Sequence, residues 1–162
     1  MVNYIKGNIL DVTKGIIVQQ VNCQGVMGAG LAKQIRDKWP VVYDNYKDKV
    51  DTCQNRKDLL GNTSFSKVSI DTPLYVASIF GQFNYGRSGR FTIYPVLFKG
   101  LEYIFRLSEV DKIPVYIPKG LGCGLAGGNW EFVEEYIRDL DYIFDNKLDI
   151  IIVEKVRYYV CD

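Results

Sequence analysis

Two glycine-rich segments have the residue types and spacing to bind an anion. The first, NCQGVMGAG at 22–30, follows an apolar run that ends at Val21, and the second, KGLGCGLAGGNW at 119–130, follows IPVYIP. Glycines let the backbone turn sharply and approach a ligand closely, and a helix that begins after such a turn presents unpaired N–H groups to phosphate. Either segment alone is also compatible with an ordinary turn. Two such segments in one chain favour an anion-binding site.

A third segment, FGQFNYGRSGRFTIY at 80–94, is polar, aromatic and basic. The guanidinium groups of Arg87 and Arg90 suit bidentate phosphate contacts, and the ring of Tyr85 offers a face for stacking. The alternative is a surface hairpin with solvated arginines. The residues alone leave both interpretations open.

The composition excludes several kinds of chemistry. The chain contains no histidine, which excludes Ser–His–Asp and Cys–His catalysis and every His-ligated metal site. Cysteines 23, 53, 123 and 161 are dispersed without a CxxC pair, so we expect free thiols and no metal. Neither Cys23 nor Cys123 is followed by the arginine that a cysteine phosphatase needs, and we expect both to be packing residues. No P-loop or GxGxxG pattern is present, and we expect no cofactor.

Length and charge favour one globular domain, residues 1–162. The chain is 48% hydrophobic and 24% charged, which suits a single sizeable core. The net charge of +1 makes a nucleic-acid partner an unfavoured interpretation. No apolar run approaches the roughly 18 residues of a membrane span, and MVNYIKGNIL lacks the pattern of a signal peptide. We therefore expect no membrane association and a cytoplasmic location.

Strands and helices must alternate to position these segments. Apolar, β-branched runs predict strands, and stripes at helical spacing predict helices. The expected strands span 2–7, 16–21, 64–70, 74–80, 113–118 and 149–155. The expected helices are the stripe Leu31, Ile35 and Trp39 ended by Pro40, a short helix at 40–50, Leu97 to Phe105 with Thr92 as N-cap, and Trp130 to Phe144 with Asn129 as N-cap.

This alternation predicts an α/β fold, a three-layer α/β/α sandwich with a mixed, mostly parallel sheet. In such a sheet, ligands bind beyond the carboxyl ends of the strands. The loops after Val21, Phe80 and Pro118 should therefore meet at one edge.

With these residues in place, the chain resembles a macrodomain, the ADP-ribose-binding α/β/α fold. GNIL at 7–10 stands where the family has a G-D-[IL] segment. VNCQGVMGAGLA at 21–32 is similar to the loop around the distal ribose, and PKGLGCGLAGGNWEFV at 118–133 is similar to the pyrophosphate loop and its helix. MGAGLA and GCGLAGGNW most resemble the compact branch that includes the terminal ADP-ribose glycohydrolases and the ADP-ribose 1''-phosphate phosphatases.

The resemblance implies a set of ligand contacts. Asn8 and the Ile9 backbone would meet adenine, Asn22 would bind the distal ribose, and Tyr158 would stack on adenine. The backbone of Phe80 and Gly81 would close the cleft. With Arg87 added from the segment at 80–94, the full set of residues expected to bind the ligand is Asn8, Ile9, Asn22, Gly28, Ala29, Gly30, Leu31, Phe80, Gly81, Arg87, Gly120, Leu121, Gly122, Cys123, Gly124, Leu125 and Ala126.

Two departures from the family pattern bear on chemistry. Asn8 replaces the adenine-binding Asp, so its hydrogen bond to the exocyclic amine loses its charge. Ala126 stands where the glycohydrolase branch has a catalytic Asp, and VASIFGQ at 76–82 lacks the Lys of that branch. We therefore expect no glycohydrolysis by the Lys–Asp route.

We expect the chain to bind ADP-ribose or a derivative and to hydrolyse ADP-ribose 1''-phosphate, or to deacylate a related ADP-ribosyl ester. Asn22 and Gln24 would position the water, and Arg87 or Arg90 would neutralise developing charge. The alternative is a non-catalytic module that binds or sequesters ADP-ribose. A third interpretation, an RNA-binding domain, is disfavoured by the near-zero net charge.

Overall fold

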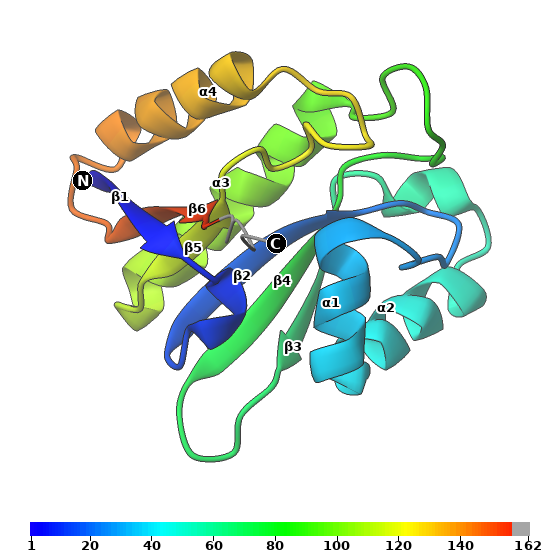
Figure 1. The fold of residues 1–162 in the computed structure, drawn as a ribbon, viewed down its shortest axis with the longest axis horizontal. Helices are drawn as coiled ribbons and strands as arrows, with labels where there is room; N and C mark the ends of the chain where they lie inside the picture. Colours follow the sequence, from blue (N-terminus) through cyan, green and yellow to red (C-terminus); the bar gives the residue numbers. More distant parts are fainter. Residues whose placement is uncertain (157–162) are drawn as a thin grey trace, which may run out of the picture.

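A six-stranded sheet forms the centre of the computed structural model, which describes residues 1–156 (Figure 1). The strand order is β1-β6-β5-β2-β4-β3, and β3 runs antiparallel to β4 while the other neighbours are parallel. This confirms the mixed, mostly parallel sheet expected from the sequence. The strands are β1 Val2–Gly7, β2 Gly15–Val21, β3 Thr63–Lys67, β4 Leu74–Phe80, β5 Val115–Pro118 and β6 Ile150–Lys155.

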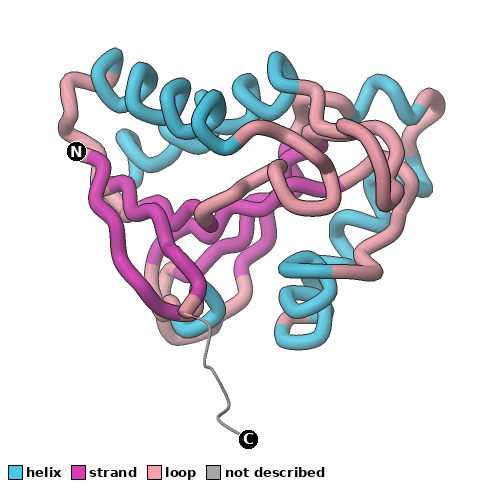
Figure 2. Tube along the Cα trace, turned by 45° about the horizontal axis from the view of Figure 1, so that its top comes forward, coloured by secondary structure: helices cyan, strands magenta, loops and turns pink. Residues whose placement is uncertain are grey.

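Helices cover both faces of the sheet (Figure 1). Two of them pack on one face and two on the other, and two short 3-10 helices lie in the connections. In Figure 2 the loops, drawn in pink, crowd between the two helical layers. The helices are α1 Gly30–Lys38 and α2 Pro40–Thr52 on one face, α3 Tyr94–Asp111 and α4 Trp130–Ile143 on the other, and the 3-10 helices η1 Ile9–Asp11 and η2 Arg56–Leu59.

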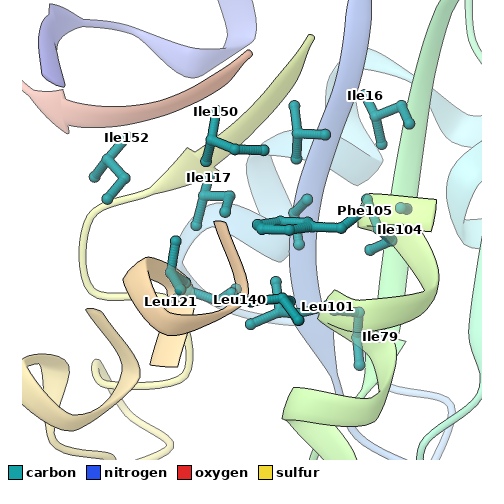
Figure 3. Packing of buried hydrophobic residues seen from close by; sticks show 14 of the residues in the cluster. Ile16, Ile79, Leu101, Ile104, Phe105, Ile117, Leu121, Leu140, Ile150 and Ile152 are labelled. Atoms are coloured by element: carbon teal, nitrogen blue, oxygen red, sulfur yellow. The ribbon is translucent and has the colours of Figure 1, made fainter. Parts of the chain in front are cut away.

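Each face of the sheet has its own apolar core, because side chains alternate along a strand. In β2, Ile16 and Val18 face α3 and α4, whereas Ile17 and Val21 face α1 and α2. Figure 3 shows the first core, in which Phe105 of α3 lies against the isoleucines of the central strands. Burial on both faces explains why these strands appear in the sequence as continuous apolar runs.

Some element boundaries differ from the sequence expectations. The strand expected at 64–70 ends at Lys67, and the strand expected at 113–118 begins at Val115. The helix expected at 40–50 starts with Pro40 in its first turn and extends to Thr52. No helix within residues 1–156 is both long and apolar enough to cross a membrane.

The two predicted N-caps had different outcomes. Asn129 is the N-cap of α4, and its side chain accepts the N–H of Glu131. The prediction that Thr92 is the N-cap of α3 was wrong. The N-cap is Ile93, whose side chain makes no capping hydrogen bond. The Thr92 hydroxyl instead donates to the carbonyl of Gly122, 2.6 Å away.

Candidate functional site

The sheet opens between β2 and β5 toward the carboxyl ends of the strands. β5 pairs with β2 only at Ile16↔Val115 and Ile17↔Tyr116, while β2 pairs with β4 as far as Val21↔Phe80. The last residues of β2 therefore border a cavity of about 530 Å³ instead of a neighbouring strand. This is the edge at which the three loops were expected to meet.

Three loops complete the cavity. We call residues 22–29 the first loop, 81–93 the second loop and 119–129 the third loop. The start of α1 closes the side next to the first loop. The lining residues are Gln19, Gln20, Val21, Asn22, Val26, Met27, Gly28, Ala29, Gly30, Leu31, Ala32, Gln82, Tyr85, Gly86, Arg87, Pro118, Lys119, Gly120, Leu121, Gly122, Gly124, Leu125 and Ala126.

The first loop is organised by a buried tyrosine of α2. The Tyr46 hydroxyl lies 2.8 Å from Asn22 Oδ1 and 2.7 Å from the Asn22 carbonyl. It also accepts the N–H groups of Gly25 and Val26, at 3.0 and 3.1 Å. Burial raises the pKa of Tyr46 well above its ordinary value, so the hydroxyl keeps its proton. One side chain thus connects three residues of this loop.

The third loop is shaped by its own backbone. Gly120, Gly122 and Gly127 adopt left-handed φ values of 89°, 72° and 72°, which glycine adopts without steric cost. Internal turns follow, in which Cys123 N–H donates to the Gly120 carbonyl at 2.8 Å and Gly128 N–H donates to the Gly122 carbonyl at 2.9 Å. The curvature of the loop is therefore set mainly by its backbone conformation and its internal backbone hydrogen bonds.

Residues with free backbone donors line the cavity in two places. Several N–H groups on its wall donate no hydrogen bond to an acceptor within residues 1–156. Unpaired N–H groups converging on a cavity are suited to phosphate oxygens, especially at a helix N-terminus. They belong to Gly28, Ala29, Gly30 and Leu31 around the start of α1, and to Gly122, Gly124, Leu125 and Ala126 in the third loop.

A polar network ties the second and third loops to β2. Gln20 Nε2 donates to Gln82 Oε1 at 2.9 Å and to the Thr92 hydroxyl at 2.8 Å. The Thr92 hydroxyl in turn donates to the Gly122 carbonyl, and the Thr92 N–H donates to the Ala126 carbonyl at 3.1 Å. Thr92 thus holds the third loop at two points, the carbonyls of Gly122 and Ala126.

The charged groups on the cavity wall are cations. Arg87 and Lys119 line it, and the exposed Lys119 pairs with Glu154 at 3.3 Å. Arg90 lies outside the wall, with its guanidinium carbon 4.9 Å from the centre of the Tyr94 ring. Among the described residues that line the cavity, none carries a carboxylate. The wall therefore favours an anion.

The structure brings most of the predicted site residues together. Twelve of the residues expected to bind or act on the ligand lie on the cavity wall: Asn22, Gly28, Ala29, Gly30, Leu31, Arg87, Gly120, Leu121, Gly122, Gly124, Leu125 and Ala126. Their roles toward a ligand stay predictions. Six others do not line the cavity: Asn8, Ile9, Gln24, Phe80, Gly81 and Cys123.

Local hydrogen bonds explain the placement of two of these six. Asn8 caps η1 by accepting the Leu10 N–H at 3.0 Å, and its side chain is exposed. Gln24 points away from the wall, since it donates to the Phe83 carbonyl and accepts from Arg56 at 2.9 Å. Ile9 and Phe80 belong to the core beneath α1 and α2. The stacking residue predicted near the end of the chain, Tyr158, lies outside the described residues.

The cysteines of the first and third loops are neutral thiols. Burial raises the pKa of Cys23 and of Cys123 to about 11. Cys23 is fully buried, and Cys123 donates to the Leu121 carbonyl at 3.2 Å. This agrees with the expectation that both are packing residues, because a nucleophilic cysteine needs a lowered pKa.

Sequence reasoning missed the residues that hold the loops, above all Tyr46 and Gln20. A signal for Tyr46 was present, because Val42, Tyr46 and Val50 recur every fourth residue and form the buried stripe of α2. A buried tyrosine hydroxyl needs a hydrogen-bond partner. Gln20 gave no such signal, because a polar residue near the end of an apolar strand is also compatible with an exposed position.

Comparison with known proteins agrees with this architecture. No protein-family model matches the sequence. A DNA ADP-ribosyl glycohydrolase of Thermus aquaticus is 26% identical over 140 residues, which are 86% of this chain and 37% of that protein. The chain thus spans little more than a third of this relative.

Solved structures resemble the whole chain more fully. The macrodomain of Mycobacterium tuberculosis DarG superposes with a TM-score of 0.78 at 24% identity, covering 94% of this chain and 97% of that one. Thermosipho africanus DarTG, solved in complex with ADP-ribose, superposes with a TM-score of 0.74 at 20% identity, covering 99% and 43%. The chain therefore has the macrodomain fold, as the DarG macrodomain does.

Proposed function

We propose that this chain binds ADP-ribose in the cavity between the first and third loops. The observation that carries the proposal is the set of backbone N–H groups in two loops of the cavity wall that have no acceptor within residues 1–156. A pyrophosphate needs many donors within a short distance, and these two loops supply them. The structural neighbour that was solved with ADP-ribose has the same fold.

The cavity offers a distinct environment for each part of the ligand. The third loop donates to the pyrophosphate, and Arg87 and Lys119 complement its charge. Asn22, at the opposite side, meets the distal ribose. Val26 and Leu125, which are 36% and 58% exposed, also line the cavity and are available for apolar contact with the ligand.

Calorimetric titration of the purified protein tests binding. ADP-ribose should bind with micromolar affinity, ADP more weakly and AMP more weakly still, because each step removes a group that the cavity contacts. Equal affinity for the three ligands, or no heat at millimolar ADP-ribose, would contradict the proposal.

A second candidate function is hydrolysis of ADP-ribose 1''-phosphate. Arg87 favours it, because this exposed guanidinium lines the cavity and can stabilise negative charge on a terminal phosphate. Water would attack phosphorus, the phosphorus–oxygen bond to the ribose would break, and the ribose oxygen would take a proton. Because the wall residues within 1–156 carry no carboxylate and the sequence has no histidine, the ligand's own phosphate oxygens would have to accept the water's proton.

Phosphate release from ADP-ribose 1''-phosphate tests this second function. Arg87→Gln should reduce turnover, and Arg90→Gln is the matched control because Arg90 lies outside the cavity wall. A parallel assay with ADP-ribosylated DNA addresses the activity for which the Thermus aquaticus relative is named. Ala126 and the residues of β4 supply neither the Asp nor the Lys of the glycohydrolase branch, so we expect no release of ADP-ribose there. Binding without turnover of either substrate would leave the non-catalytic module.

A further inference from the structure

The orientation of the Asn22 side-chain amide is determined by its neighbours. Its Oδ1 lies 2.9 Å from the backbone N–H of Gln24, a group that can only donate. Its Nδ2 lies 2.8 Å from the carbonyl of Val26, a group that can only accept. In a flipped amide, Nδ2 would face the Gln24 N–H, a donor against a donor, and Oδ1 would face the Val26 carbonyl, an acceptor against an acceptor. Asn22 is therefore held in one orientation.

This orientation limits what Asn22 offers to a ligand. Oδ1 already receives the Gln24 N–H and lies 2.8 Å from the Tyr46 hydroxyl. Nδ2 carries two protons and gives one of them to Val26. Asn22 is 93% buried, with an exposed fraction of 7%, and it lines the cavity. The group left for a ligand is one N–H donor.

Tyr46 holds this arrangement from outside the cavity. It lies on α2, is fully buried and does not line the cavity. Within residues 1–156, all of its hydrogen bonds to the first loop involve its hydroxyl. Phenylalanine would fill the same space against Phe80, whose ring centre lies 5.5 Å away. Burying a hydroxyl is costly unless it is hydrogen-bonded. The hydroxyl is therefore explained by its bonds to the loop rather than by packing.

We propose that Tyr46 is a positioning residue that makes Asn22 a hydrogen-bond donor to the ligand, and that this donor selects ligands with a sugar hydroxyl oxygen beyond the diphosphate. The proposal rests on ADP-ribose binding in this cavity. It adds that the preference for ADP-ribose over ADP depends on a side chain that never touches the ligand. Removing the Tyr46 hydroxyl takes away one partner of Asn22 Oδ1 and the shared acceptor of the Gly25 and Val26 N–H groups. The loop that carries the Gln24 and Val26 partners of the amide then loosens, so the free N–H of Asn22 is no longer presented in one direction.

The test compares Tyr46→Phe with Tyr43→Phe. Tyr43 is the matched control, because it lies on the same helix and its hydroxyl donates weakly to the Gly25 carbonyl, 3.4 Å away, without contacting Asn22. Dissociation constants are measured for ADP-ribose and for ADP, which lacks the distal ribose. Tyr46→Phe should weaken ADP-ribose by about tenfold, the size of one lost hydrogen bond, and change ADP by less than about twofold. Tyr43→Phe should leave both affinities unchanged.

A double variant separates positioning from general loosening. Asn22→Ala should lose the same preference for ADP-ribose, and Tyr46→Phe combined with Asn22→Ala should lose no more than Asn22→Ala alone. Additive losses, or a parallel fall in ADP-ribose and ADP affinity for Tyr46→Phe, would overturn the proposal, since they would mean that Tyr46 only stabilises the cavity.

A ligand-free measurement keeps the inference separate from the proposed function. In a ¹⁵N NMR spectrum, the held Asn22 amide should give two dispersed proton resonances, and in Tyr46→Phe these should move toward the values of a freely rotating amide. If the wild-type protein does not bind ADP-ribose, the proposed function is wrong, and the proposed ligand selection is wrong with it. If ADP-ribose binds and the Asn22 resonances are the same in both proteins, the positioning role alone is wrong.

Discussion

The first and third loops face each other across the cavity, yet they are held in opposite ways. The first loop depends on a side chain from another element, since the Tyr46 hydroxyl bonds the backbone of Gly25 and Val26 and the side chain of Asn22. The third loop depends on glycines with left-handed φ values, such as Gly122, and the Thr92 hydroxyl of the second loop donates to the Gly122 carbonyl. Both loops receive a hydroxyl from another segment, but the first loop has its backbone N–H groups and the Asn22 side chain held by that hydroxyl, whereas the third loop is shaped mainly by its own backbone conformation.

This difference has a consequence for binding. A loop supported by one side chain can present a specific side-chain group, and here that group is the Asn22 N–H. A loop built from glycines presents backbone N–H groups, which are suited to any phosphate. We therefore expect changes in the third loop to affect all diphosphate ligands equally, and changes around the first loop to affect selectivity.

The largest expected effect comes from adding a methyl group at Gly122. Its φ is +72°, and a Cβ there would lie 2.9 Å from Gln20 Oε1 and 3.1 Å from the Thr92 hydroxyl oxygen. Gly122→Ala should lower the free energy of unfolding by about 1–3 kcal/mol, through strain and displaced neighbours. Urea unfolding of the wild type and the variant measures this difference in free energy.

Gly124→Ala is the matched control for this change. Gly124 does not have a positive φ, and a Cβ there would meet nothing within 4 Å. Its free energy of unfolding should stay within about 0.5 kcal/mol of the wild type. Equal destabilisation by the two substitutions would show that the conformation of Gly122 does not hold the third loop.

A smaller effect on stability is expected at Thr92, which connects Gln20 of β2 to the third loop. Thr92→Val removes the hydroxyl that donates to Gly122 and accepts from Gln20. It should lower the free energy of unfolding by about 0.5–1.5 kcal/mol, because the Gly122 carbonyl loses one of its two donors and keeps the Gly128 N–H. ADP and ADP-ribose should weaken by the same factor in calorimetry. Thr92→Ser keeps the hydroxyl and should retain most of both affinities, and a selective loss of ADP-ribose binding would contradict the comparison.

A still smaller effect is expected from the exposed cation of the second loop. Arg87→Gln should weaken ADP-ribose by about threefold at low salt and less at high salt, because an exposed charge is screened. Arg90→Gln, outside the wall, should change little. Titrations at two salt concentrations measure both variants, and an effect of Arg90 as large as that of Arg87 would contradict this placement.

The smallest effect concerns the thiols, one in each glycine loop. Burial raises the pKa of Cys23 and Cys123 from 9.0 to about 11, so the folded state favours the neutral thiol. Their contribution to stability is therefore present below pH 9 and is lost as the pH rises toward 11. Between pH 7 and 9, ADP-ribose affinity should not change on account of either thiol. Alkylation of each cysteine followed by mass spectrometry should accelerate near pH 11, whereas half-maximal reaction at or below pH 9 would refute the buried placement.

Much of the architecture follows from local sequence patterns. The apolar run at 16–21 is the central strand, buried on both faces, and the glycine segments after Val21 and Pro118 meet at the cavity as predicted. Asn129 caps α4 because the N–H that it accepts lies two residues away. Patterns of this kind act over a few residues, so they can be recognised without knowing the fold.

Other features were missed or misplaced because they depend on contacts between distant residues. Thr92 resembles an N-cap, but the Gly122 carbonyl, 30 residues further along the chain, takes its hydroxyl proton. Gln24 was expected beside the ligand, but it bonds Arg56, 32 residues away, and turns from the wall. In both cases a tertiary partner overrode the local preference.

The sequence by itself determined the layers, the strand–loop–helix order and the two glycine loops at one edge, because hydrophobic periodicity and glycine conformation are local properties. Only the tertiary structure decided which polar atoms remain available to a ligand. Asn22 and Tyr46 lie 24 residues apart and meet only once α2 packs beside the end of β2. A hydrogen bond requires its partners within about 3 Å, and that proximity comes from packing the whole chain.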